Sequence, residues 1–62
     1  MSKYAIMMVL FWAEQDLTRL IVACVQEKAD DGKAFINSMI NEKRRHIRQL
    51  KDALRVEFGI IF

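Results

Sequence analysis

Residues 24–36, CVQEKADDGKAFI, separate two regions of the chain that carry the same apolar pattern in different phases. On each side of this segment, apolar residues recur at steps of three and four, which is the spacing of one face of an α-helix. The first stripe consists of Ile6, Leu10, Ala13, Leu17, Leu20 and Cys24, and the second of Ile36, Ile40, Lys43, Ile47, Leu50 and Leu54. If the first stripe continued in phase, it would reach Glu27, Asp31 and Ser38, which cannot form an apolar surface. The chain is therefore predicted to turn between the stripes.

The predicted turn is Asp30-Asp31-Gly32, because the chain has no proline and only one other glycine, Gly59. We predict one helical-hairpin domain over residues 1–62. Its parts are a first helix over about 3–29, a turn at 30–32, a second helix over about 33–58 and an apolar tail at 59–62. Asp31 can cap the second helix, or Gly32 can instead close the first helix in a left-handed conformation. At the far end, Gly59 is expected to reverse the backbone so that Ile60 folds onto the last turn in a Schellman motif.

The apolar residues exceed what one hairpin seam can bury. A domain of about 60 residues buries only about 60% of the surface of its unfolded chain, and such small scaffolds usually need a disulfide, a metal or a partner chain. Cys24 is the only cysteine and His46 the only histidine, so a partner chain is the remaining source of stability. We therefore predict an all-α, antiparallel two-helix hairpin that assembles into a four-helix bundle as a homodimer. The residues predicted to form the dimer or partner interface are Met7, Met8, Phe11, Trp12, Ile21, Phe35, Met39, Phe58, Ile60, Ile61 and Phe62.

One end of the hairpin carries the largest excess of apolar residues. The first helix is apolar on all sides from Ile6 to Ala13, and Val56, Phe58 and residues 60–62 lie at the same end of the second helix. Three uses are compatible with this surface: a dimer interface, a docking site for another protein, or contact with a membrane surface. The N-terminal run is too short to span a bilayer, which needs about 20 apolar residues. It also lacks the small-x-small pattern of a signal-peptide cleavage site.

Charge is distributed unevenly between the two halves of the chain. The net charge of +2 divides into −2 for residues 1–32 and +4 for residues 33–62. Helices of opposite sign suit each other in an antiparallel pair, so this asymmetry has a structural explanation before any functional one. If the helices fold about Asp31, Glu14 is expected near Arg48 and Asp16 near Arg45.

A basic ridge follows the second helix beside its apolar stripe. The ridge comprises Lys33, Asn37, Asn41, Arg44, Arg48, Lys51 and Arg55. A row of cations on a rigid helix can follow the phosphates of a nucleic acid. No aromatic residue is interleaved with the ridge, so stacking on the bases of a single strand is not indicated. The alternatives are a solvated ridge partly neutralised by Glu14, Asp16, Glu42 and Asp52, or a contact with an acidic protein or lipid headgroups.

The remaining polar residues indicate no catalytic chemistry. Lys43 interrupts the second stripe, where a lysine can extend its stem along apolar neighbours and fix the register and oligomeric state. Cys24 has no neighbouring general base, and His46 has no second ligand for a metal. Since there is also no glycine-rich phosphate loop and no catalytic triad, we expect neither an enzyme nor a cofactor.

These observations predict a small, non-catalytic regulatory or adaptor protein in the reducing cytoplasm. Its expected partners are a second copy of itself and, through Lys33, Arg44, Arg48, Lys51 and Arg55, the backbone of a nucleic acid. The alternative is a protein-interaction module that uses Met8, Trp12 and residues 58–62, and a third reading is association with a membrane surface.

Overall fold

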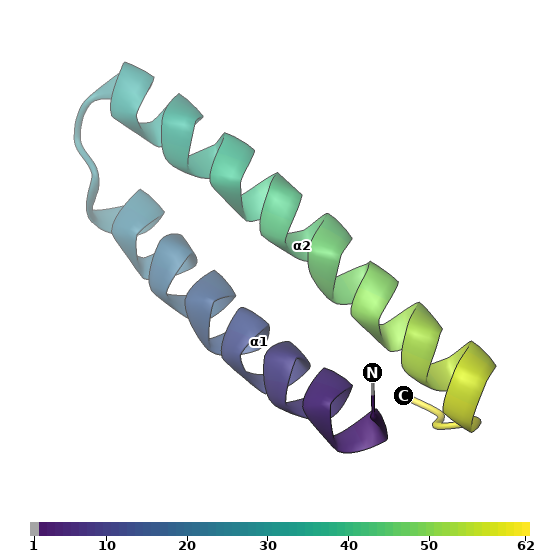
Figure 1. Cartoon of the computed structure of the whole chain (residues 1–62). Coiled ribbons are helices and arrows are strands. Elements are labelled where there is room, and N and C mark those ends of the chain that lie inside the picture. The colour runs from purple at the N-terminus through teal and green to yellow at the C-terminus, as the bar shows by residue number, and fades with distance from the viewer. Residues whose placement is uncertain (1) are drawn as a thin grey trace.

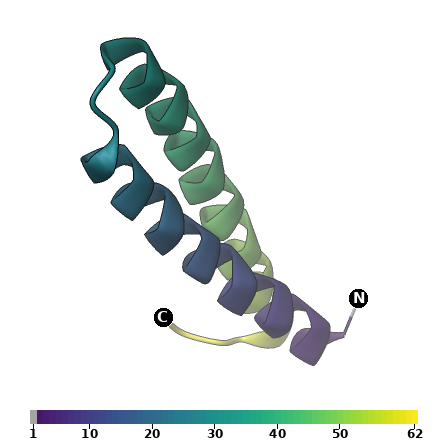
Figure 2. The ribbon, with the colours of Figure 1, turned by 90° about the vertical axis from the view of Figure 1, so that its left-hand side faces the viewer.

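The computed structural model describes residues 2–62 as two antiparallel α-helices joined by a short loop. Helix α1 spans Lys3–Gln26 and helix α2 spans Asp30–Phe58, so that both termini lie at the same end (Figure 1). The helix axes are inclined to one another when the molecule is seen from the side (Figure 2). The molecule is a rod of 42 × 18 × 15 Å. The predicted helical hairpin is thus confirmed.

The two apolar stripes form the seam between the helices. From α1, Ile6, Leu10 and Ala13 are buried, and from α2, Ile40, Ile47 and Leu54 are buried. Leu17, Leu50 and Ile60 are partly buried against this core. Cys24 is only half-buried at the turn end of the seam, and its Sγ donates a 3.6 Å hydrogen bond to Oδ1 of Asn37. Cys24, the last residue of the first stripe, is therefore only partly shielded from solvent.

The turn lies at residues 27–29, three residues before its predicted position. The backbone N–H of Glu27 closes α1 on the carbonyl of Ala23. The Glu27 side chain then folds forward, and its Oε1 accepts hydrogen bonds from the N–H groups of Lys28 at 3.0 Å and Ala29 at 3.1 Å. One carboxylate thus satisfies two backbone donors that the turn would otherwise leave to water.

The predicted caps at Asp31 and Gly32 are not formed. The N-cap residue of α2 is Ala29, which has no side chain able to cap, and Asp31 lies inside the first turn, where its Oδ1 accepts from the N–H of Gly32 at 2.9 Å. Gly32 is helical, since the only positive φ among residues 2–62 belongs to Gly59. A Cβ at Gly32 would lie 2.7 Å from Cδ of Glu27. The glycine therefore makes room for the capping carboxylate.

The earlier turn changes which residues of the two helices lie at the same level. Asp16 was expected near Arg45, but its Oδ2 lies 3.8 Å from Nζ of Lys43. An earlier turn brings earlier residues of α2 to the level of a given α1 residue, so the partner of Asp16 precedes Arg45 in the sequence.

The helix ends explain where α1 begins and α2 stops. Ser2 caps α1, because its Oγ accepts a 3.1 Å hydrogen bond from the N–H of Ala5. Gly59 ends α2 with φ 68° and donates its N–H to the carbonyl of Arg55 at 3.0 Å, which is the single bond of an αL cap. The N–H of Ile60 reaches Leu54 instead of Arg55, so the predicted Schellman pattern is wrong in detail. Ile60 nevertheless packs on the core as expected.

Among residues 2–62, Leu54 is the one side chain with an exposed fraction of 0%. We expect Leu54→Ala to lower the free energy of unfolding by about 2–5 kcal/mol, a large part of the total of about 3–9 kcal/mol for a chain of this length. Val56→Ala, two residues along and 77% exposed, is the matched control and should change it by less than about 0.5 kcal/mol. Thermal unfolding followed by circular dichroism measures both, and equal effects would contradict this description of the core.

The contact between Glu27 and Gly32 predicts a coupled pair of substitutions. Gly32→Ala should gain roughly 0.5–1 kcal/mol of helix stability when Glu27 is already alanine. With Glu27 present, most of this gain should be lost, because the new methyl group displaces the capping carboxylate. A double-mutant cycle by urea unfolding at fixed protein concentration measures the coupling. The same gain in both backgrounds would show that Glu27 does not occupy this space.

Candidate binding faces

Two long faces flank the seam, and they differ in charge. Asp16, Leu20 and Ala23 of α1 line a shallow groove together with Met39 and Lys43 of α2, so these residues share one side of the hairpin. A second groove of about 570 Å³ on the same side is lined by Leu20, Phe35, Ser38, Met39, Glu42, Lys43 and His46. By helical spacing, Val9 and Trp12 lie on the same side of α1 as Asp16, and we call these α1 residues the α1 row. In the same way Ala53, five turns after Phe35, lies on the same side of α2 and belongs to the α2 row. We call this surface the balanced face.

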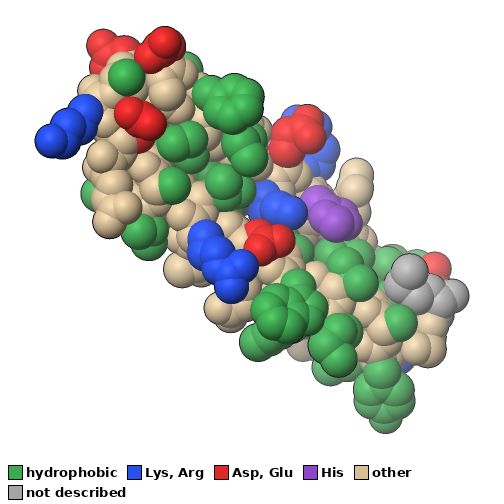
Figure 3. Space-filling view, turned by 60° about the vertical axis from the view of Figure 1, so that its left-hand side comes forward, with side chains coloured by type: hydrophobic (Ala, Val, Ile, Leu, Met, Phe, Trp, Pro, Cys, Tyr) green, Lys and Arg blue, Asp and Glu red, His purple; other side chains and the backbone are tan. Residues whose placement is uncertain are grey.

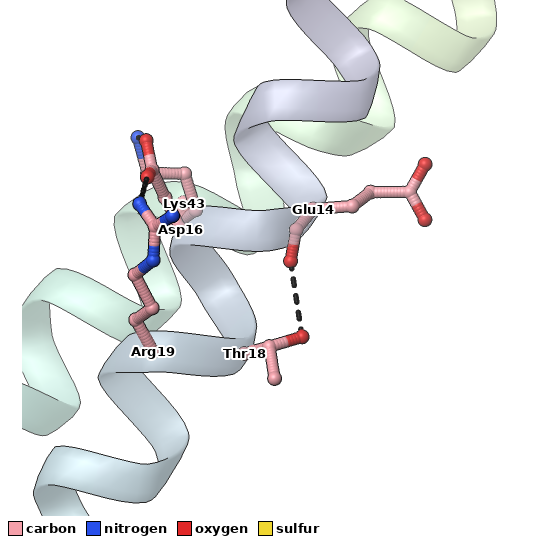
Figure 4. A network of polar contacts seen from close by, with 5 residues as sticks. All are labelled: Glu14, Asp16, Thr18, Arg19 and Lys43. Atoms are coloured by element: carbon pink, nitrogen blue, oxygen red, sulfur yellow. Dashed lines mark hydrogen bonds and ion pairs between the residues drawn. The ribbon is translucent and has the colours of Figure 1, made fainter.

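The charges on the balanced face neutralise one another. Oδ1 of Asp16 lies 3.3 Å from Nη1 of Arg19, and its other oxygen faces Lys43, so one carboxylate contacts two cations (Figure 4). Glu42 adds one negative charge to the face, so the formal charges of these four residues sum to zero. A band of charged side chains lies between two hydrophobic areas, one toward the turn and one toward the termini (Figure 3).

The other side of the seam, which we call the cationic face, carries the basic ridge. Arg44, Arg48, Lys51 and Arg55 line a shallow groove of about 560 Å³ on this side. Lys51 lies over the ring of Phe62, with Nζ 5.5 Å from the ring centre. Ile61 and Phe62 of the C-terminal tail therefore line the groove beside the ridge.

Little of the expected neutralisation of the ridge occurs. Nη2 of Arg55 pairs with Oδ1 of Asp52 at 2.8 Å, whereas Arg44, Arg48 and Lys51 form no ion pair within residues 2–62. The Glu14 carboxylate points away from the polar network around Asp16 (Figure 4). The Asp16 carboxylate pairs with Arg19 and Lys43. The Glu42 carboxylate pairs with Arg45, so neither acid neutralises the ridge. Lys33 at the turn end and the three clustered cations Arg44, Arg48 and Lys51 therefore keep their charge available for a ligand.

An apolar strip of α1 lies beside the ridge on the cationic face. By helical spacing, the strip consists of Met7, Phe11, Ile21 and Val25, all of them exposed. Glu14 and Thr18 interrupt it at mid-length. The cationic face thus combines a hydrophobic half and a positively charged half.

The remaining predicted site residues are dispersed. Lys33 lies in the first turn of α2, far from the four clustered cations, and Met8 lies on the side of α1 that is turned away from α2. Ile60 belongs to the core, and Trp12 belongs to the balanced face. The predicted interface residues at the open end thus include members of both faces, of the core and of the side of α1 turned away from α2.

The groups considered for chemistry remain isolated. Within residues 2–62, no three His, Cys, Asp or Glu side chains are close enough to hold a metal ion. His46 is exposed at the edge of the larger groove. Cys24 is a free thiol that donates a hydrogen bond to the amide oxygen of Asn37. Over the same part of the chain, neither helix has the length and hydropathy needed to cross a bilayer.

No protein-family model, curated protein or solved structure matches the chain.

Lys43 is half-buried in the seam, with 28% of its side chain exposed. We expect Lys43→Leu to raise the free energy of unfolding by about 1 kcal/mol, because a methyl-rich side chain then fills an apolar position. The same change should broaden the distribution of oligomers, since a polar residue in a seam fixes register and assembly state. Thermal unfolding and light scattering measure the two effects. An unchanged or lower melting temperature would contradict the prediction.

Proposed function

We propose that the protein is a non-catalytic regulatory or adaptor protein that assembles as a homodimeric four-helix bundle and binds the phosphate backbone of a nucleic acid through its basic ridge. The observation that carries the proposal is the set of ridge cations without an acidic partner, Arg44, Arg48 and Lys51. The bundle supports the binding function by holding the ridge on a rigid helix.

The exposed surface supports the bundle. The hairpin exposes 4820 Å², whereas a compact folded monomer of 7.3 kDa exposes about 4,200 Å². Its radius of gyration is 13.8 Å, against about 11 Å for a compact domain of this length. The excess area of about 600 Å² approaches the area of about 800 Å² that each partner buries in a standard interface. Large side chains such as Trp12 and Phe35 contribute to this excess.

The spacing of the ridge supports the phosphate contact. Arg44, Arg48, Lys51 and Arg55 follow one side of α2 at steps of four, three and four residues. At about 1.5 Å per residue they span about 16 Å, with neighbouring cations about 4.5–6 Å apart. Such a row neutralises several phosphates at once and releases their counterions, which gives affinity without sequence specificity.

Salt dependence tests this proposal directly. Four phosphate contacts predict a slope of about −3.6 for the logarithm of the association constant for duplex DNA against the logarithm of the salt concentration. The triple substitution of Arg44, Arg48 and Lys51 to glutamine should reduce the magnitude of that slope by about 2.7. Fluorescence anisotropy with a labelled 20-base-pair duplex measures both values.

The matched control removes the same amount of charge away from the ridge. Lys3, Lys28 and Arg45 changed to glutamine should leave the slope nearly unchanged, because these cations lie outside the cationic groove. Equal losses in both triple variants would show that net charge, and not the ridge, is responsible for binding. Absence of binding at low salt would reject the nucleic-acid function.

A second candidate, binding to an anionic membrane surface, is favoured by the apolar strip beside the ridge. An interfacial amphipathic surface combines buried apolar side chains with cations at the headgroups. Substituting Met7, Phe11 and Ile21 with glutamine should abolish co-sedimentation with phosphatidylserine vesicles and leave duplex binding intact. Vesicle binding with no duplex binding would favour the membrane over the nucleic acid.

A further inference from the structure

We propose that two copies pair face to face through their balanced faces, in an antiparallel arrangement. The two-fold axis lies between the two faces and runs across the helices, at the level of Asp16 on α1 and of Arg44 on α2. This inference rests on the proposed bundle and specifies its interface. The occupant of the balanced face is therefore a second copy of this chain, with α1 against α1 and α2 against α2.

Electrostatics select the balanced face for self-association. Its charges are paired within the hairpin, so two such faces can meet without bringing unmatched like charges together. The cationic face has the opposite property. If two cationic faces met with α2 against α2, the side chains of Arg44, Arg48 and Lys51 would lie against their own copies. If they met with α2 against α1, the same cations would lie against the apolar strip, where Glu14 is the only acid. Both arrangements bury cations without partners, which is costly.

The α1 rows are complementary in size about this axis. Trp12 and Leu20 lie four residues to either side of Asp16, so Trp12 of one copy meets Leu20 of the other. Val9 and Ala23 lie seven residues to either side and meet in the same way. Trp12 is 52% exposed in the single hairpin, which leaves about half of a large aromatic surface to be covered.

The α2 rows are complementary about the same axis. Phe35 and Ala53 lie nine residues to either side of Arg44, so the large ring meets a small side chain. Glu42 and His46 lie two residues to either side of Arg44, so the Glu42 carboxylate of one copy, a hydrogen-bond acceptor, lies near the His46 imidazole of the other. Phe35 is 68% exposed in the single hairpin and lines the larger groove of this face. The two axis levels also agree with each other, because Asp16 contacts Lys43, the neighbour of Arg44.

Charge along the rod favours the antiparallel arrangement over one with both turns at the same end. The turn end carries Glu27, Asp30 and Asp31 against Lys28 and Lys33, and acidic side chains are visible at that end (Figure 3). Turning the second copy end for end brings these acids toward the end of α2 that carries Lys51 and Arg55. With both turns together, two ends that each carry a net charge of −1, counting Lys28 and Lys33, would lie side by side.

Cysteine cross-linking tests the axis. In a Cys24→Ser background, Val9→Cys combined with Ala23→Cys should form a covalent dimer under mild oxidation. Thiols held together in the dimer meet at an effective concentration near about 1 mM, so at about 10 µM protein cross-linking should be roughly a hundred-fold faster than collision. The single variants Val9→Cys and Ala23→Cys are matched controls, because each thiol then lies about 21 Å from its copy, beyond disulfide reach.

A second pair of variants tests which face is used. Trp12→Gln should raise the dissociation constant of the dimer by about thirty-fold or more, as for a buried tryptophan in an interface. Met7→Gln, a comparable loss of apolar surface on the cationic face, should leave it nearly unchanged. Sedimentation equilibrium measures both constants. Because Trp12 is the only tryptophan, its emission should also shift to shorter wavelength as the wild-type protein is concentrated.

The outcomes separate this inference from the proposed function. A dimeric mass with cross-linking no faster than in the single variants, or equal effects of Trp12→Gln and Met7→Gln, overturns the proposed interface and leaves the bundle standing. A monomer at every concentration overturns both the interface and the bundle. Duplex binding is measured separately and depends on neither result.

Discussion

The Glu27 carboxylate accepts hydrogen bonds from the N–H groups of Lys28 and Ala29, and this local interaction fixes the point at which the chain reverses. Gly32 leaves room for this carboxylate, because a Cβ at that position would lie 2.7 Å from Cδ of Glu27. The position of this reversal also determines the register between the helices, that is, which residue of α2 lies opposite each residue of α1. Asp16 therefore meets Lys43 and does not neutralise the ridge. The hydrogen bonds of Glu27 thus affect the ion pairing of Asp16, which lies about 16 Å away along α1 at about 1.5 Å per residue.

The seam gives the hairpin its stability and also limits it. Two helices can bury only the sides that face each other, and the core accordingly consists of a single row from each helix. The flanks on both sides remain in contact with solvent, and they carry most of the aromatic side chains. The balanced face carries paired charges, and the cationic face carries a row of cations. The balanced face is therefore suited to contact with a second copy, and the cationic face to contact with a polyanion.

Much of the hairpin could be predicted from periodicity. The residues of both stripes are those that the structure buries or partly buries, because a 3.6-residue helix brings every third and fourth side chain to one face. The position of the turn could not be predicted in the same way. Asp30, Asp31 and Gly32 have strong turn preferences, yet an α-helix also accepts acids in its first turn, where they favour the dipole. Asp31 was expected to cap α2, but no side chain does so, and the longer Glu27 side chain instead bonds the N–H groups of the loop.

The sequence by itself determined that the chain forms two helices, which sides of them meet, and that the second helix carries a row of cations, because all three follow from residue spacing along a helix. The tertiary structure decided which acids meet which cations. That outcome depends on the register between helices, and the register depends on hydrogen bonds to one carboxylate at the turn, which no periodic pattern encodes. Only with this register known do Arg44, Arg48 and Lys51 emerge as cations without partners among the described residues, and only then do the two faces differ in charge.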